Sequence, residues 1–256
     1  MRHTVLIVPG VYGSGPDHWQ TWIQAQLSQA RRVGGIDWDA PVLARWAARV
    51  RREIDESPHA VWLVAHSFGC LASVVAAADR PEKVAGVLLV APADPERFSP
   101  AGLRGRATGA AAASIAPCLP QRPLGVASVM VASSNDPWLN APVAQDWAER
   151  WGSRLIDLGP AGHINAESGY GPWPFGLELL RAMQKTHNNA PLGAIGEGGG
   201  SPRGRRGVLA RLRHRTRAEL GFLPKVRPRA CQVTSLQESP RAGELLRPRG
   251  ARAIAQ

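Results

Sequence analysis

The stretch VWLVAHSFGC, residues 61–70, decides the fold that we expect for this chain. An apolar run that favours β-structure leads into a turn of small residues around Ser67, and an alanine-rich helical run follows. This is the layout of a nucleophile elbow, G-x-S-x-G, in which strand, sharp turn and helix expose a serine hydroxyl above a sheet. The first glycine is replaced by Ala65, whose methyl group still fits such a turn, and Gly69 is present. Taken alone, the pentapeptide can also be an ordinary strand–helix turn with a capping serine.

The chain has two parts of different composition. Residues 1–186 carry 17 Lys and Arg against 16 Asp and Glu, whereas residues 187–256 carry 14 against 4. The net charge of +11 therefore belongs almost entirely to the second part, while all nine Trp lie in the first. A segment so rich in Gly, Arg and Pro cannot bury enough apolar surface to offset its chain entropy. We expect one folded domain over 1–186 and a mostly disordered basic tail over 187–256.

Three roles for the basic tail stay open. Its composition resembles out-of-frame translation of GC-rich DNA, which would make it a functionless extension. It can also be a flexible linker or interaction segment, or it can make salt-sensitive contacts with nucleic acid or an anionic surface. The nucleic-acid role is weakly supported, because no aromatic residues that could stack on bases are interleaved with the arginines.

The cysteines and the N-terminal residues indicate in which cellular compartment the protein is expected. The three cysteines are odd in number and lack metal-ligand spacing, which favours free thiols in a reducing compartment. The N-terminal apolar run is too short for a signal peptide. No window reaches the roughly 18 apolar residues that a membrane span needs. We expect a cytoplasmic protein without a membrane span, and the sequence implies no cofactor and no metal.

Apolar runs alternate with helical patterns along the first part. Strands are expected at residues 4–8, 33–36, 60–65, 84–90, 126–132 and 155–158, and helices at 18–29, 42–54, 69–78, 141–151 and 175–184. Near-continuous apolar strands that alternate with helices are typical of a parallel sheet with helices on both faces. The sequence therefore predicts a three-layer α/β sandwich with a mainly parallel six-stranded sheet. Residues 92–125, with a helical run at 110–113, are expected to make a surface excursion where a small lid would sit.

Three polar residues follow the third, fifth and sixth expected strands in an order that suits nucleophilic catalysis. They are Ser67, Asp136 and His163. A serine nucleophile needs a base to take its proton, and the base needs an acid to hold its tautomer. α/β-Hydrolases carry these groups in this chain order, at the carboxyl ends of the strands. We predict Ser67 as nucleophile, His163 as base and Asp136 as acid.

Other residues compete for the acid and base roles. Asp136 precedes a proline and can simply begin a helix, and Asp94 and Asp157 are rival acids at less suitable places. Among the histidines, His18 is the main competitor and is expected beside the site. His66 lies inside the elbow and is expected to point away from the serine oxygen.

The backbone around the serine suggests an oxyanion hole. One N–H should come from Phe68, the residue after the nucleophile, and a second from Gly10 or Val11 in the loop after the first strand. Candidates to line a small substrate pocket are His18, Trp19, Trp138 and Trp173, although tryptophans also commonly belong to the core.

Several motifs together resemble one family. They are PG at 9–10, GSGPDHWQ at 13–20, DWDAP at 37–41, AHSFGC at 65–70, SSNDPW at 133–138 and GHINAESGYGPWP at 162–174. They resemble the small serine hydrolases of the α/β-hydrolase superfamily typified by YdeN and retinoblastoma-binding protein nine, over about residues 3–185. The resemblance implies an α/β-hydrolase fold with Ser67, Asp136 and His163 as the triad. The sequence departs from the family at Phe175, where an acidic residue is expected.

The predicted activity is hydrolysis of a small acyl substrate through an acyl-enzyme, with a carboxylic ester favoured and amides open. The alternative is a non-catalytic protein-binding module on a hydrolase scaffold, with the basic tail as its interaction segment. A complete set of nucleophile, base and acid argues against that alternative, because a scaffold alone does not need all three.

Overall fold

The computed structural model describes residues 3–105 and 113–189. All of them lie in the first of the two units into which the chain divides, Met1–Arg205 and Arg206–Gln256. Beyond residue 189 the predicted tail lies outside the described residues, as do residues 110–112 of the expected helical run. Both cysteines within the described ranges, buried Cys70 and exposed Cys118, are free thiols. No helix in these ranges is long and apolar enough to cross a membrane.

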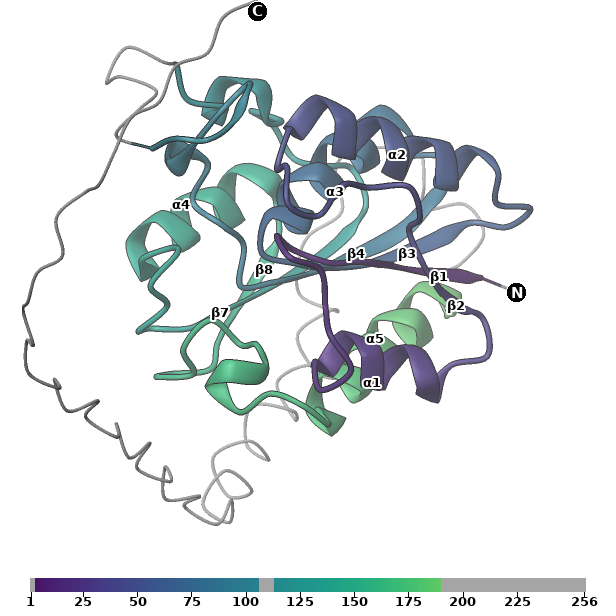
Figure 1. Ribbon diagram of the computed structural model, residues 1–256. Coiled ribbons are helices and arrows are strands. Elements are labelled where there is room, and N and C mark those ends of the chain that lie inside the picture. Colours follow the sequence, from purple (N-terminus) through teal and green to yellow (C-terminus); the bar gives the residue numbers. More distant parts are fainter. Residues whose placement is uncertain (1–2, 106–112, 190–256) are drawn as a thin grey trace, which may run out of the picture. The chain divides into compact units, whose positions relative to one another are not determined.

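A parallel sheet forms the centre of this unit (Figure 1). Its strands lie in the order β2-β1-β3-β4-β7-β8, and every neighbouring pair is parallel. The strands are β1 (Thr4–Val8), β2 (Ala30–Arg32), β3 (Val61–His66), β4 (Val84–Val90), β7 (Ala127–Ala132) and β8 (Arg154–Asp157). β3 and β4 are buried along their whole length, which explains their continuous apolar sequences. The predicted six-stranded parallel sheet is confirmed.

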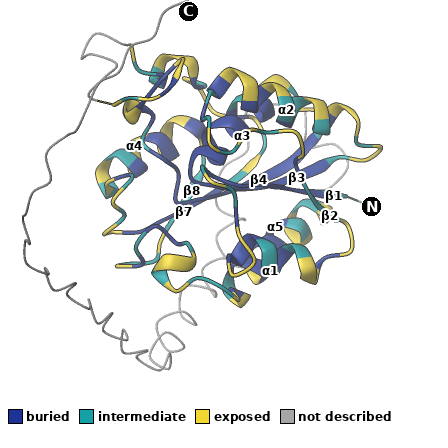
Figure 2. Ribbon diagram, viewed as in Figure 1, coloured by how far each residue is buried: buried dark blue, intermediate teal, exposed yellow. Residues whose placement is uncertain are grey.

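Helices cover both faces of the sheet. α1 (Trp19–Gln26) and α5 (Pro174–Asn188) lie on one face. α2 (Leu43–Asp55), α3 (Phe68–Asp79) and α4 (Ala141–Trp151) lie on the other. Figure 2 shows that the buried residues gather on the strands and on the helix faces turned toward them. α3 is rich in small residues because it packs between α2 and the sheet, where nine of its residues are buried.

Two predicted boundaries differ from the structure. The second strand runs over Ala30–Arg32 instead of 33–36, since this edge strand is half-buried and lacks an apolar run. Val33 directly follows it, is buried, and donates its N–H to the Ile7 carbonyl. α5 continues to Asn188, two residues past the predicted domain boundary, and the ring of His187 packs against Trp62 with centroids 5.7 Å apart.

The segment from 92 to 125 is more than a surface excursion. It contains the short helices η1 (Pro95–Arg97) and η3 (Ala116–Cys118), and a hairpin of β5 (Phe98–Ser99) with β6 (Gly102–Leu103). The ring of Phe98 lies 4.6 Å from that of Phe68, between centroids. The prediction is wrong on this point, because widely spaced apolar residues of the segment enter the main core: Phe98, Ile115, Leu119 and Leu124.

Candidate active site

The turn at Ser67 has the backbone of a nucleophile elbow. Ser67 lies at φ +53° and ψ −126°, a left-handed region that non-glycine residues rarely adopt, and its N–H donates to the Val90 carbonyl at 3.1 Å. A Cβ on Gly69 would lie 2.3 Å from the Pro9 carbonyl oxygen, so glycine is required there. Ala65 is fully buried inside β3 and is accommodated there. The departure from G-x-S-x-G therefore falls at the position that tolerates a methyl group.

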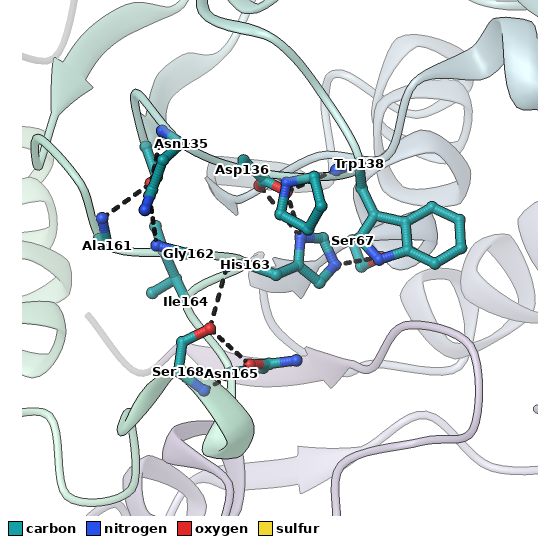
Figure 3. Close-up of polar contacts among 12 residues, drawn as sticks. Ser67, Asn135, Asp136, Trp138, Ala161, Gly162, His163, Ile164, Asn165 and Ser168 are labelled. Carbon is teal, nitrogen blue, oxygen red and sulfur yellow. Dashed lines mark hydrogen bonds and ion pairs between the residues drawn. The ribbon is translucent and has the colours of Figure 1, made fainter. Parts of the chain in front are cut away.

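Three side chains from different strand ends meet at this turn (Figure 3). His163 Nε2 lies 2.9 Å from Ser67 Oγ, and His163 Nδ1 lies 2.9 and 3.0 Å from the two Asp136 carboxylate oxygens. Because a carboxylate only accepts hydrogen bonds, the neutral imidazole carries its proton on Nδ1 and leaves Nε2 to accept the Ser67 hydroxyl proton. We refer to these residues as the Ser67–His163–Asp136 cluster.

The rival acids have other partners. Asp94 accepts the Glu96 N–H at 2.9 Å, and Asp157 accepts the Gly159 N–H at 2.8 Å. Both carboxylates thus stabilise local turns. The Asp136 side chain is only 2% exposed, and the carboxylate faces the histidine.

The loop that carries His163 is tied to the loop that carries Asp136. Ser133 Oγ accepts the Ala161 N–H at 2.9 Å, and Asn135 Oδ1 accepts the Gly162 N–H at 2.7 Å. The two loops follow the paired strands β7 and β8. This support could not be predicted from the sequence, because the serine and the asparagine resemble ordinary turn residues until their partners are known.

The four pocket candidates differ in exposure. Trp19 is fully buried, and its indole N–H donates to the Ile164 carbonyl at 2.8 Å, which favours a place in the core over a place on the wall of a pocket. Trp173 is 6% exposed and packs against Trp19, with ring centroids 5.1 Å apart. Trp138 is half-buried, with its ring 6.1 Å from that of His163 (Figure 3), and it remains the best placed of the aromatic candidates.

His18 lies beside the cluster as a neutral residue. It is 5% exposed, its Nδ1 accepts the Gln20 N–H at 3.1 Å, and its ring lies 4.8 Å from that of His66. Burial, and then the charges of Arg32 and His163, lower the pKa of His18 to about 4. The accepting Nδ1 leaves the ring proton on Nε2, so His18 can act as a hydrogen-bond donor at neutral pH.

His66 makes a contact that the sequence does not predict. Its Nε2 lies 2.9 Å from the main-chain carbonyl oxygen of His163, a buried contact between residues 97 positions apart in the chain. Since a carbonyl only accepts, the imidazole is the donor. The sequence offers no signal for this contact beyond the place of His66 in the elbow.

Two of the predicted oxyanion donors, Phe68 and Gly10, lie next to the serine. A Cβ on Gly10 would lie 2.6 Å from Ser67 Cβ and 3.3 Å from its Oγ, so the loop after β1 passes directly over the nucleophile turn. The N–H groups of Phe68, Gly10 and Val11 have no hydrogen-bond partner among the described residues. They are therefore free to donate to a bound oxygen.

Other features lie apart from this site. Within residues 3–105 and 113–189, no group of three or more His, Cys, Asp or Glu could hold a metal ion. A hollow of about 450 Å³ is lined by residues 118–122 and by the end of α3 that is far from Ser67. Its nearest α3 residue, Val75, is eight positions from Ser67, which corresponds to about 12 Å along a helix. The hollow does not reach the cluster.

Comparison with known proteins gives the family. The profile of the family described as Serine hydrolase matches residues 5–182. The structure is similar to a YdeN-like hydrolase from Pectobacterium atrosepticum, at 36% identity and a TM-score of 0.64, over 73% of this chain and 92% of that chain. It is also similar to the ydeN gene product of B. subtilis, at 19% identity and a TM-score of 0.57, over 72% of this chain and 100% of that chain.

A more distant similarity concerns the fold alone. It is to Est1E from Butyrivibrio proteoclasticus with ferulic acid bound, at 13% identity and a TM-score of 0.52, over 72% of this chain and 88% of that chain. No curated protein matches the chain. The family match covers well over half of the chain and includes the elbow and the strand ends described above. The chain belongs to the serine hydrolase family and is a small serine hydrolase of the α/β-hydrolase superfamily.

Proposed function

We propose that this hydrolase cleaves small carboxylic esters through an acyl-enzyme, with Ser67 as nucleophile, His163 as base and Asp136 as acid. The observation that carries the proposal is the continuous hydrogen-bonded chain from Ser67 Oγ through His163 to Asp136, with all distances between 2.9 and 3.0 Å. It has the order and geometry of a serine-hydrolase triad.

The reaction would proceed in two halves. Ser67 Oγ attacks the acyl carbonyl carbon while its proton passes to His163 Nε2, and the negative oxygen is held by the N–H of Phe68 with that of Gly10 or Val11. When the intermediate collapses, the ester C–O bond breaks and His163 gives the proton to the leaving alcohol. A water then attacks the acyl-enzyme in the same way and releases the acid.

Asp136 and the surroundings of the base support these steps. The carboxylate fixes the tautomer in which Nε2 can accept a proton, and it stabilises the imidazolium that forms. Half-buried Trp138, next to His163, would contact the substrate, and the Nε2–H of His18 would donate to a substrate oxygen.

The cytoplasmic location expected from the free thiols stays a prediction.

Labelling with a fluorophosphonate tests the proposal. The wild type should be labelled and should hydrolyse p-nitrophenyl acetate, and Ser67→Ala should abolish labelling and lower kcat roughly 10⁴-fold or more. The matched control is Ser73→Ala, which removes a buried hydroxyl without a hydrogen-bond partner from the same helix and should leave labelling intact. A wild type that resists labelling would favour the non-catalytic alternative, and a Ser67→Ala protein labelled equally well would refute Ser67 as the nucleophile.

A further inference from the structure

The turn directly after the base has an uncommon backbone. Ile164 is fully buried and lies at φ +48°, a left-handed conformation that is a genuine outlier for a β-branched side chain. Such outliers persist only where the surrounding structure holds them. Because Ile164 directly follows His163, the same turn sets the direction in which the imidazole leaves the chain.

Two ring N–H groups hold this turn from two other elements. His66, the last residue of β3, donates Nε2–H to the His163 carbonyl at 2.9 Å, and Trp19, the first residue of α1, donates Nε1–H to the Ile164 carbonyl at 2.8 Å. Both hydrogen bonds are buried. The carbonyl groups on either side of the outlier are thus both bound by aromatic donors, and neither donor belongs to the Ser67–His163–Asp136 cluster.

The remaining polar groups of His163 are also bound. Its N–H donates to Ser168 Oγ at 3.1 Å, and that hydroxyl donates to Asn165 Oδ1 at 2.9 Å (Figure 3). Its side chain is held by Asp136. Within the described residues, His163 is therefore bound through its N–H, its carbonyl and both ring nitrogens.

We propose that His66 and Trp19 are positioning residues, whose ring N–H groups hold the strained His163–Ile164 turn so that the imidazole reaches Ser67 Oγ. The inference rests on the proposed role of His163 as base. His66 is covalently adjacent to Ser67, so its bond joins the turn of the nucleophile directly to the turn of the base. Trp19 binds the same turn one residue further along, at the Ile164 carbonyl.

The chemistry of the two donors suits this role. An indole N–H is a donor at every pH. Burial lowers the pKa of His66 well below its usual value, so its imidazole stays neutral and keeps its one proton available for the carbonyl. The rings lie close together, with 6.0 Å between the centroids of Trp19 and His66 and 4.8 Å between those of His66 and His163.

Single substitutions that remove a ring N–H donor and keep an aromatic ring test the proposal. Trp19→Phe deletes the indole N–H and keeps an aromatic ring, and His66→Phe deletes the imidazole N–H. With p-nitrophenyl acetate, kcat should fall roughly tenfold or more while KM stays within about twofold, because a displaced base slows the chemical step without changing the binding surface. His66→Gln retains an amide N–H at a similar reach and should recover most of kcat.

The matched control is Trp151→Phe. Trp151 is also buried, and its indole N–H donates to the Pro120 carbonyl at 3.1 Å, away from His163. Trp151→Phe and Trp19→Phe should lower the melting temperature to a similar extent, but only Trp19→Phe should lower kcat. If His66→Phe does not fold, the comparison of the two tryptophan variants decides the question.

The outcomes separate this inference from the proposed function. If the wild type is labelled through Ser67 but Trp19→Phe keeps the kcat of Trp151→Phe, the positioning role is refuted and the proposed function stands. If His66→Gln is as slow as His66→Phe, the donor role of His66 is refuted. A wild type that is neither labelled nor active would refute both proposals, and the Ser67→Ala comparison reveals that case.

Discussion

Gly69→Ala changes the closest backbone approach in the elbow. A Cβ at this position would lie 2.3 Å from the Pro9 carbonyl oxygen and 2.5 Å from that of Val8. Ordinary contact begins at 3.4 Å, so α3 and the end of β1 must separate by about 1 Å. Neither neighbour is a flexible side-chain end, because both oxygens belong to the backbone at the end of a buried strand.

The expected loss follows from that separation. Overpacking of a core costs about 1–3 kcal/mol, and the rigid neighbours place this substitution at the upper end, at about 3 kcal/mol of unfolding free energy. For a domain of this size, that lowers the melting temperature by about 6–12 °C. The same shift moves the loop of Gly10 and Val11 away from Ser67, and a misplacement of about 1 Å costs roughly 100-fold in kcat.

Thermal unfolding and ester hydrolysis measure the two effects, with Gly15→Ala as control. A Cβ on Gly15 meets nothing within 4 Å, so that variant should keep full activity and gain up to about 1 kcal/mol of stability from a less flexible unfolded chain. A Gly69→Ala protein with the melting temperature and kcat of the wild type would show that the elbow does not depend on close backbone packing.

Two further predictions concern pH and the domain boundary. Because the folded state lowers the pKa of His18 to about 4, the unfolded chain takes up this proton first as pH falls below 6.5, and stability is lost between pH 6.5 and 4. The free energy of unfolding, measured with urea at pH 7 and at pH 4.5, should fall by about 2 kcal/mol less in His18→Asn than in the wild type. An equal fall in both proteins would show that His18 does not cause this loss of stability. A chain that ends at Asn189 should keep the melting temperature and kcat of the full chain. A chain that ends at Thr186 should melt a few degrees lower, because it loses the packing of His187 and the 3.1 Å contact between His3 and Asn188. Equal melting temperatures of the two shortened chains would show that residues 187–189 are not needed by the folded domain.

The central strands could be predicted closely because burial on both faces leaves a continuous apolar run. β1 and β4 have the predicted bounds, and β3 differs by one residue at each end. The edge strand β2 could not be placed in this way, because Ala30, Arg31 and Arg32 are all half-buried. Its place is set by pairing with β1, which the local sequence does not encode.

The candidate site shows the same division between local and distant contacts. Ser67, Asp136 and His163 could be chosen because polar residues that follow parallel strands gather at one edge of the sheet. The partner of His66 lies 97 residues away, and that of Trp19 lies 145 residues away. Such contacts leave no periodicity to detect, so the sequence could not predict that His66 and Trp19 bind the turn at His163.

The sheet order has a consequence for how the protein becomes active as it folds. Ser67 follows the central strand β3, whereas His163 follows β8, which lies at the end of the sheet order beside β7. The two residues are 96 positions apart, so their contact closes a long loop, whose entropic cost leads us to expect that the contact forms late in folding. We therefore expect a refolding chain to regain its helices and central strands before Ser67 meets His163. After dilution from denaturant, the return of fluorophosphonate labelling should therefore mark the docking of this edge strand, and it should lag behind the circular dichroism signal of the helices and central strands.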